Sequence, residues 1–246
     1  MLLGFFADIH ANRPAFAACL GVARARGVER IILIGDYVGY GADPEWTVDT
    51  VMGLVETGAW AVRGNHDHAI STPGESMNAE AQAAIEWTRG RLDGAQRRFL
   101  AALPLTLAVD DRLYVHSEAS QPPRWRYIRS TADAARSMTA TDARITFCGH
   151  IHRPALYSMS VAAKMTDFVP TTGVPVELLG SRRWLAVVGS VGQPRDGDPA
   201  ASFVTFDTAS REITYCRAPY DIEQAARRIR DNGLPVGLAE RLSVGM

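Results

Sequence analysis

Short apolar runs alternate with helical patterns in the first half of the chain, and this alternation constrains the fold more than any other feature of the sequence. Three of the runs are predicted to be strands, at residues 2–7, 30–34 and 60–63. Helical patterns separate them, at about residues 15–26 and 44–58. Proline at the start and glycine at the end of the second pattern are typical of helix boundaries. The alternation indicates an α/β fold in which helices cover sheets.

The second half of the chain is richer in strands. We predict them at residues 105–109, 113–115, 144–148, 156–160, 184–188, 202–207 and 212–217. Further helices are expected at about residues 77–89, 94–102, 131–138, 221–230 and 235–242. No internal repeat, low-complexity tract or long linker divides the 246 residues. We therefore predict one α/β domain covering residues 1–246, with sheets packed together and covered by helices.

Five of the six histidines lie just beyond an apolar run. Together with nearby Asp and Asn side chains, eight residues share this position: Asp8, His10, Asp36, Asn65, His66, His116, His150 and His152. Ligands bind at the carboxyl ends of strands in open α/β sheets. If the predicted strands are neighbours, these side chains converge on one crevice although they are far apart in the sequence.

These residue types suit divalent metal ions, because imidazole nitrogen and carboxylate oxygen are ligands of Zn, Fe and Mn. Without His66 the set has seven members, too many for one tetrahedral ion but suited to two ions that share a carboxylate. Asp36 is the natural bridge. A pair of metals clamps a phosphate and lowers the pKa of a bridging water. His66 remains as a general acid for the leaving oxygen, since its ordinary pKa of about 6.5 keeps both protonation states accessible.

Three glycines immediately precede proposed ligands at the strand ends. They are Gly35, Gly64 and Gly149. Because glycine has no Cβ, we predict that the backbone turns sharply at each of them.

Five short motifs occur in a fixed order between residues 2 and 152. They read Asp8-x-His10, Gly35-Asp36, Gly64-Asn65-His66-Asp67, His116 and Gly149-His150-x-His152. A single D-x-H or G-D pair is a weak signal, whereas five blocks in order, each after an apolar run, are a strong one. The series resembles the calcineurin-like metallophosphoesterase superfamily. Residues 39–44 and 189–198 extend the resemblance to a bacterial and archaeal branch of small phosphoesterases.

The resemblance implies a four-layer α/β/β/α sandwich and a dinuclear enzyme. Such an enzyme would hydrolyse a phosphodiester, a phosphomonoester or a nucleotide-type pyrophosphate by attack of a hydroxide bridging two divalent metals. By motif position, the first metal would take Asp8, His10, Asp36 and His152. The second would take Asp36, Asn65, His116 and His150. His66 would contact the phosphate and assist the leaving group. The metals could be Mn, Fe, Zn or Ni, because sites of this kind accept several ions.

One motif departs from the pattern of the protein Ser/Thr phosphatases. Their G-D-x-V-D-R-G block has an Asp that supports the catalytic histidine and an Arg that grips phosphate. This chain has Gly39 and Tyr40 at those positions, which weakens an assignment as a protein phosphatase. A substrate-binding arginine must then be absent or come from elsewhere. Arg195, in a Gly-rich loop after a strand, is the first candidate, ahead of Arg63 and Arg13.

Four residues near the motifs have two interpretations each. His68 lines the pocket or lies in an exposed loop, and we favour the loop. Asp67 orients His66 or a metal ligand, or it is the N-cap of a helix before Ala69. Trp125 and Tyr127 form a substrate wall, or they pack their loop against the protein.

Two other functions compete with the phosphoesterase hypothesis. A phosphoesterase-fold scaffold that binds protein partners would usually have lost ligands or the catalytic histidine, and this chain retains them all. A metallonuclease needs a basic groove, which a net charge of −1 does not indicate. We therefore expect a small phosphorylated substrate and no nucleic-acid partner, and we leave the oligomeric state open.

The cysteines and the hydropathy pattern bear on the compartment. Cys19, Cys148 and Cys216 form no C-x-x-C pair, so we expect reduced and mostly buried thiols. The apolar N-terminal stretch lacks a basic flank and is interrupted by Asp8, unlike a signal peptide. No segment has the roughly 18 uninterrupted apolar residues of a membrane span. We expect a cytoplasmic protein that does not associate with membranes.

Overall fold

The computed structural model describes residues 1–72, 74 and 77–246. Its strands are β1 (Leu2–Phe6), β2 (Arg30–Ile34), β3 (Trp60–Val62), β4 (Thr106–Val109), β5 (Arg112–Val115), β6 (Ile145–Cys148), β7 (Ala155–Met159), β8 (Met165–Phe168), β9 (Val176–Glu177), β10 (Arg183–Val187), β11 (Ala201–Asp207) and β12 (Glu212–Ala218). Its helices are α1 (Arg13–Ala25), α2 (Pro44–Glu56), α3 (Asn65–Ser71), α4 (Ala79–Arg91), α5 (Gly94–Ala102), α6 (Thr131–Thr139), α7 (Ile222–Asp231) and α8 (Val236–Val244), with a 3₁₀ turn at Pro122–Arg124.

The strands form two six-stranded mixed sheets. The first sheet has the order β3-β2-β1-β11-β12-β9, and the second has the order β4-β5-β6-β10-β7-β8. In the first sheet β1, β2 and β3 are parallel to one another. In the second sheet β5, β6 and β10 are likewise parallel. Each sheet therefore has three neighbouring carboxyl ends at one edge, and these ends carry the loops with the predicted ligands.

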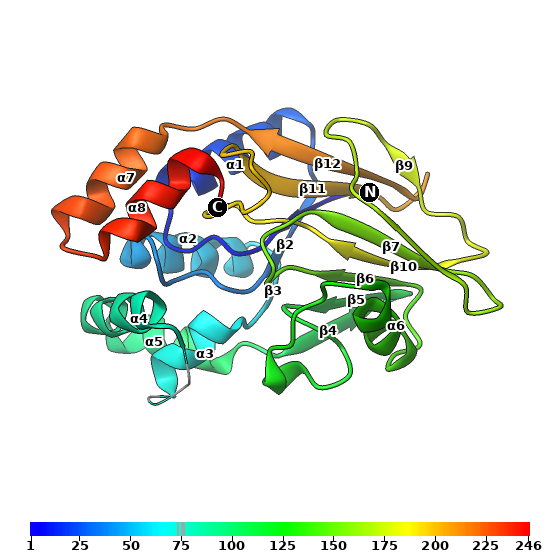
Figure 1. Cartoon of the computed structure of the whole chain (residues 1–246), viewed down its shortest axis with the longest axis horizontal. Coiled ribbons are helices and arrows are strands. Elements are labelled where there is room, and N and C mark those ends of the chain that lie inside the picture. Colours follow the sequence, from blue (N-terminus) through cyan, green and yellow to red (C-terminus); the bar gives the residue numbers. More distant parts are fainter. Residues whose placement is uncertain (73, 75–76) are drawn as a thin grey trace.

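The two sheets pack face to face and form the central layers of a sandwich (Figure 1). Their inner faces share a core that includes Phe5 of β1 and Phe147 of β6, whose rings stack with centroids 3.9 Å apart. Helices α1 and α2 cover the outer face of the first sheet through a second core around Phe16 and Val48. Helix α6 covers the outer face of the second sheet through Met138. The predicted four-layer α/β/β/α arrangement is confirmed.

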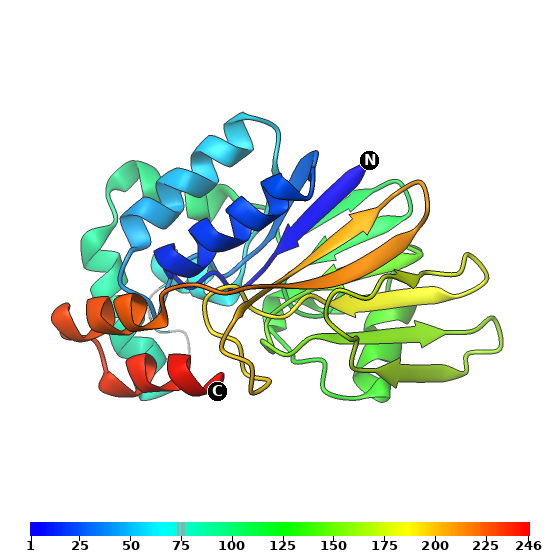
Figure 2. The ribbon, with the colours of Figure 1, turned by 90° about the horizontal axis from the view of Figure 1, so that it is seen from above.

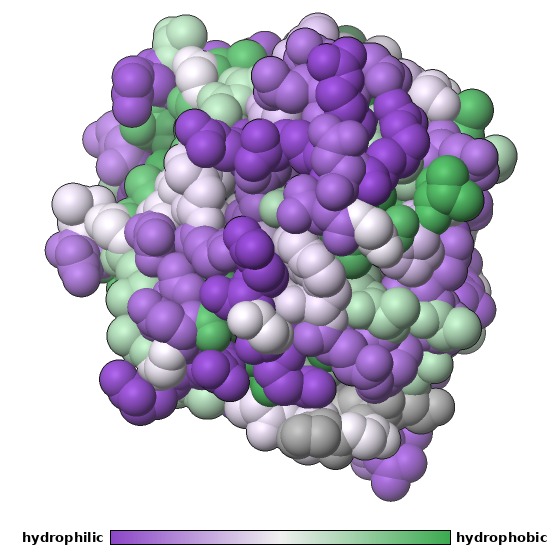
Figure 3. All heavy atoms as spheres, turned by 90° about the vertical axis from the view of Figure 1, so that its left-hand side faces the viewer, coloured by the Kyte–Doolittle hydropathy of each residue, from purple (hydrophilic) through white to green (hydrophobic). Residues whose placement is uncertain are grey.

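A fourth apolar cluster joins α4, α7 and α8. Ala81 and Ala84 of α4 lie buried against Ala225 and Leu238 of the C-terminal helices. Figure 2 shows these helices beyond one end of the sheets. On the face of the molecule at this end, hydrophobic side chains of the described residues are scattered among hydrophilic ones (Figure 3).

Most of the predicted elements occur within two residues of their expected bounds, because strong periodicity and well-placed turn residues mark them. Asn12, for example, caps α1 by accepting a hydrogen bond from the Ala15 amide at 3.2 Å. The prediction missed α3, β8 and β9. Helix α3 is seven residues long and β9 only two, too short to show a period. Strand β8 lies at the edge of its sheet and is largely exposed, so it lacks an apolar signature.

Two smaller expectations can also be compared with the structure. All three cysteines are free and buried, as predicted. Among the described residues, no helix combines the length and the apolar character that crossing a membrane requires.

Candidate metal centre

The predicted ligands lie together at the carboxyl ends of five parallel strands. They come from the loops after β1, β2, β3, β5 and β6, and all of them are buried except Asn65, which is partly exposed. Backbone hydrogen bonds join these loops within each sheet, as from the Asp8 amide to Gly35 (3.0 Å) and from the Gly149 amide to His116 (2.9 Å). The Gly192 amide donates to the Asp8 carbonyl at 2.9 Å and joins the loop after β10 to the same site.

Five of the candidate ligands adopt left-handed backbone conformations. Their φ angles lie between 49° and 71°, at Asp8, His10, Asp36, His150 and His152. Residues other than glycine rarely adopt these φ angles, and the backbone strain costs on the order of 1–3 kcal/mol at each residue. Strained residues of this kind cluster at functional sites, where the surrounding structure holds them in place.

Two of the three glycines before the ligands have a different role from the predicted one. Only Gly35 has a positive φ, of 75°, so the predicted sharp turn occurs there but not at Gly64 or Gly149. At those two positions the ligand itself turns or a helix begins, and glycine provides space. A Cβ on Gly64 would lie 2.1 Å from Asp36 Oδ1, and one on Gly149 would lie 2.5 Å from Asp8 Oδ2.

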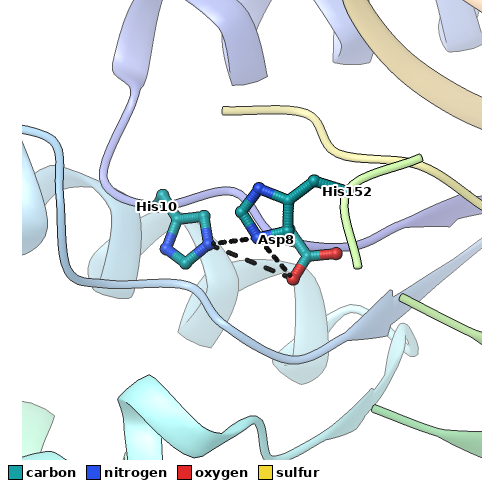
Figure 4. A group of neighbouring side chains, drawn as sticks. All are labelled: Asp8, His10 and His152. Carbon is teal, nitrogen blue, oxygen red and sulfur yellow. Dashed lines mark hydrogen bonds and ion pairs between the residues drawn. The ribbon is translucent and has the colours of Figure 1, made fainter. Parts of the chain in front are cut away.

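Asp8, His10 and His152 form the first group of facing donor atoms, shown in Figure 4. The Nε2 atoms of His10 and His152 are 3.1 Å apart, and Asp8 Oδ1 lies 3.4 Å from His152 Nε2. Asp8 Oδ1 is buried and has no hydrogen-bond partner within the described part of the chain. Asp8 Oδ2, in contrast, accepts a hydrogen bond from the His150 amide at 2.9 Å.

Both histidines are fixed with their Nε2 lone pairs directed at each other. His10 Nδ1 donates to the Val38 carbonyl at 3.1 Å, and His152 Nδ1 donates to the Gln193 carbonyl at 2.7 Å. In neutral imidazole the other nitrogen is then an acceptor. Two acceptors 3.1 Å apart cannot bond to each other, but both can bind one cation, because ligand atoms about 2.1 Å from a tetrahedral ion are roughly 3.4 Å apart. The residues therefore fit a metal ion.

A second group of donor atoms has the same arrangement. His116 Nε2 lies 3.1 Å from both Asn65 Oδ1 and His150 Nδ1. Here His116 Nδ1 donates to the Ile34 carbonyl at 2.8 Å, and His150 Nε2 donates to the Trp125 carbonyl at 2.7 Å. When both imidazoles are neutral, the nitrogens that face each other again carry lone pairs. Hydrogen bonds of this kind fix the tautomers of metal-binding histidines.

Asp36 lies between the two groups. Its Oδ2 atom is 3.8 Å from His10 Nε2, 3.3 Å from His116 Nε2 and 4.0 Å from His66 Nε2. Burial raises the pKa of Asp36, but His116 and His66 outweigh it and hold that pKa well below its ordinary value. Burial lowers the pKa of His116, while the Asp36 carboxylate overrides this effect and raises it to about 9. The negative charge of Asp36 thus stabilises a positive charge at this position, and a bound cation can supply it.

His66 is buried beside the ligands and is held mainly by packing. Its ring lies 4.8 Å from the His10 ring and 4.6 Å from the Tyr40 ring, measured between centroids. His66 Nδ1 has no hydrogen-bond partner in the described residues. A Cβ on Gly39 would lie only 2.3 Å from that atom. Burial lowers the pKa of His66 to about 4, so the side chain is neutral at pH 7 before substrate binds.

Asp67 serves the ligand loop more than it serves His66. Its Oδ2 accepts hydrogen bonds from the amides of Asp36 (2.8 Å) and Gly64 (2.9 Å), and its Oδ1 accepts one from Tyr37 (2.9 Å). Gly64 is the N-cap of α3, and Asp67 is the third residue of that helix, where its side chain accepts a hydrogen bond from the N-cap amide. The interpretation that Asp67 orients a ligand is therefore correct, and the ligand is Asp36; the alternative, a helix N-cap before Ala69, is wrong, because α3 already begins at Asn65.

Of the three candidate substrate-binding arginines, only Arg195 approaches the centre. Its guanidinium carbon lies 5.7 Å from the centroid of the Tyr40 ring, which contacts His66. Arg63 Nη1 donates to the Ala101 carbonyl at the end of α5 (2.8 Å), and Arg13 lies over Trp46 of α2. The structure therefore gives Arg63 and Arg13 partners outside the cluster.

The loop after His116 both walls the site and supports it. Tyr127 stacks on the His150 ring with centroids 4.2 Å apart, and 38% of its surface is exposed. Trp125 lies between the rings of His116 and His68, at 6.1 and 5.8 Å. His68 thus lines this wall and is only partly exposed, contrary to the exposed loop that we favoured.

The sequence did not reveal the groups that orient the ligands. Four of them are backbone carbonyls, of Ile34, Val38, Trp125 and Gln193. A carbonyl carries no residue-type signal, so only its proximity to a motif could have suggested it. Ile34 and Val38 flank Gly35-Asp36, whereas Trp125 and Gln193 lie outside the five motifs.

Comparisons with known proteins identify the family of this site. A family model described as "Calcineurin-like phosphoesterase superfamily domain" matches residues 1–211. The chain belongs to the calcineurin-like phosphoesterase superfamily. The chain is also similar to a metallophosphoesterase from Sphaerobacter thermophilus, with 32% identity and a TM-score of 0.88 over 100% of this chain and 99% of that one.

Two archaeal proteins extend the likeness. The uncharacterized protein MJ0912 of Methanocaldococcus jannaschii is 31% identical over 99% of this chain and 98% of its own length. The hypothetical protein PH1004 of Pyrococcus horikoshii OT3 is 18% identical and shares the fold, with a TM-score of 0.80 over 100% of this chain and 98% of that one. The family and the buried His and Asp groups together indicate a hydrolase that acts on phosphoesters at a metal site.

Proposed function

We propose that this calcineurin-like phosphoesterase hydrolyses small phosphorylated substrates with two divalent ions, drawn from Mn, Fe, Zn and Ni. The observation that carries the proposal is the pair of groups of buried donor atoms with Asp36 Oδ2 between them. Asp8, His10 and His152 would hold one ion, and the remaining ligands, Asn65, His116 and His150, would hold the other. Asp36 would contact both.

The ions and the residues divide the chemistry. When bound, the ions supply Lewis acidity and a water of lowered pKa. The residues position the ions. Their left-handed backbone conformations and the hydrogen bonds of the second ring nitrogen of each histidine fix the direction in which the ligand atoms point. Asp67 holds the amide of Asp36 and so fixes the shared carboxylate.

His66 would protonate the leaving oxygen. Its pKa of about 4 in the free protein is set first by burial, so an anionic phosphate placed beside the ring would raise that pKa and favour the imidazolium. Arg195 would contact a phosphate oxygen and share its charge, since a guanidinium binds phosphate in a forked geometry. Arg195 would then have the phosphate-binding role that, in the protein phosphatases, belongs to an arginine at the position of Tyr40.

We also propose that the protein acts in the cytoplasm. Cys19, Cys148 and Cys216 are free and buried, with no disulfide, as is usual in a reducing compartment.

Removal of the metal tests this function. We expect a chelator to abolish hydrolysis of bis(p-nitrophenyl) phosphate, and addition of excess Mn²⁺ to restore it. The chelated protein should also unfold at a lower temperature, because an ion that binds only the folded state stabilises it. Hydrolysis that continues after elemental analysis shows complete removal of metal would contradict the proposal.

A further inference from the structure

A pocket of about 470 Å³ opens beside the metal centre. This volume lies in the range of about 300–1,000 Å³ typical of small-molecule sites. Its lining includes three guanidinium groups, from Arg129, Arg153 and Arg195, and no carboxylate among the described residues. We call it the arginine pocket.

Two chains of contacts connect the arginine pocket to the centre. On one side, Arg195 lies over Tyr40, whose ring contacts both His10 (4.5 Å) and His66 (4.6 Å). On the other side, Arg129 lies 4.4 Å over the ring of Tyr127.

Tyr127 completes the second chain, because its ring stacks on His150, a candidate ligand. Ile151, between the two histidines of the last motif, also lines the pocket. A substrate whose reacting phosphate lies at the ions therefore has this pocket as its direct continuation.

The three arginines are positioned without neutralising partners. Arg153 Nε donates to the Arg195 carbonyl at 2.7 Å, and Arg195 Nη2 donates to Gln193 Oε1 at 2.7 Å. Within the described part of the chain, the structure records no ion pair between any of the three and a carboxylate. The whole chain has a net charge of −1, so this is a local concentration of positive charge. Guanidinium groups arranged in this way suit a phosphate group.

A second hollow also has Tyr127 in its lining. It has a volume of about 340 Å³ and is lined by Asn65, Trp125 and His150 among others. The ring of Tyr127 borders both hollows. The lining of this second hollow also includes Arg124, so the centre has a neighbour with three arginines and a neighbour with one.

We propose that Arg129 and Arg153 of the arginine pocket bind a second phosphate group of the substrate, next to the reacting phosphate that Arg195 contacts. The substrate is therefore a small compound with at least two phosphates, such as a nucleoside polyphosphate. This inference rests on the proposed function for the place of the reacting phosphate. Two separate hollows of limited volume favour a small molecule over a nucleic acid, which would need a continuous groove.

Binding of two matched nucleotides tests the proposal without requiring turnover. Calorimetry would measure the affinity of α,β-methylene-ADP and of AMP for the Mn²⁺-loaded protein, with Mn²⁺ in excess. We expect α,β-methylene-ADP to bind at least about ten-fold more tightly, since charge-assisted hydrogen bonds are among the stronger polar contacts. The double variant Arg129→Gln/Arg153→Gln should lose most of this difference. Arg129→Gln alone, which keeps the Arg153–Arg195 hydrogen bond, should lose part of it.

The control carries the same change of charge elsewhere. Arg24→Gln/Arg98→Gln alters two exposed arginines on α1 and α5 and should bind both nucleotides as the wild type does. The double variant in the pocket should also bind as much Mn²⁺ as the wild type, measured by elemental analysis, which separates a failure of the pocket from a failure of the metal centre.

Three results would overturn the inference. Equal affinity for the two nucleotides would do so, as would a preference that both arginine variants retain. A single-stranded oligonucleotide that bound more tightly than α,β-methylene-ADP, and lost this affinity in the double variant, would assign the arginines to a nucleic acid. Absence of any hydrolytic activity with all metals, together with intact nucleotide discrimination, would contradict the proposed function alone.

Discussion

The metal centre and the arginine pocket beside it are built in different ways. In the centre the candidate ligands are almost all buried, have strained backbones and are joined by hydrogen bonds between loops of both sheets. In the arginine pocket Arg129 and Arg153 are exposed; Arg129 lies over the ring of Tyr127, and Arg153 donates to the Arg195 carbonyl. Backbone geometry at the strand ends therefore holds the candidate ligands in place, whereas in our proposal the choice of substrate depends on exposed side chains.

Among the substitutions, the largest effect on turnover should come from that of His66, which our account does not assign as a metal ligand. We expect His66→Ala to lower kcat by about 10²–10⁴-fold, the usual contribution of a general acid. Metal content, measured by elemental analysis of the same sample, should equal that of the wild type. Wild-type turnover of an aryl phosphodiester by this variant would remove the assigned role of His66.

Asp67 tests whether the backbone of the ligand loop determines metal binding. Asp67→Asn replaces one acceptor oxygen with an NH₂ group, which would face the amide donors of Asp36, Gly64 or Tyr37. We expect metal affinity to fall about 10–100-fold, as for other residues that orient ligands. Competition with a fluorescent chelator would measure it. Asp231→Asn, at the exposed end of α7, is the matched control, and equal affinities for the two variants would contradict this role.

Gly39 tests whether His66 is held by packing or by a carboxylate. In the protein phosphatases an Asp at this position supports the catalytic histidine, and by that pattern Gly39→Asp would increase activity. We expect about ten-fold lower kcat instead, because the new Cβ would lie 2.3 Å from His66 Nδ1 and φ at this residue is 82°. Gly39→Ala should have a similar effect. Higher kcat in the Asp variant would show that His66 lacks a support that this chain could accommodate.

The metal centre could be predicted from the sequence to a much greater extent than the arginine pocket. Asp8, Asp36 and His150 each follow a buried strand, and hydrophobic runs reveal such strands. The convergence of loops from two sheets follows from the parallel order of the strands at one edge of each sheet. This order could be predicted only because the motifs resemble a known family.

The arginine pocket could not be predicted in the same way. The stack of Arg129, Tyr127 and His150 joins a loop to a strand end more than 20 residues away, and no periodic pattern specifies such a contact. Arg13 and Arg63 were reasonable candidates by their position beside motifs, yet their side chains contact Trp46 and Ala101. Side-chain direction depends on packing that a single sequence does not determine.

The number of ions in the centre is the most direct test of the account. Anomalous diffraction from crystals grown with saturating Mn²⁺ would locate each ion and its ligands. We predict two ions about 3.5–4 Å apart, the usual separation of catalytic pairs, with Asp36 contacting both. A single ion at full occupancy, or no ion among these residues, would contradict the central claim.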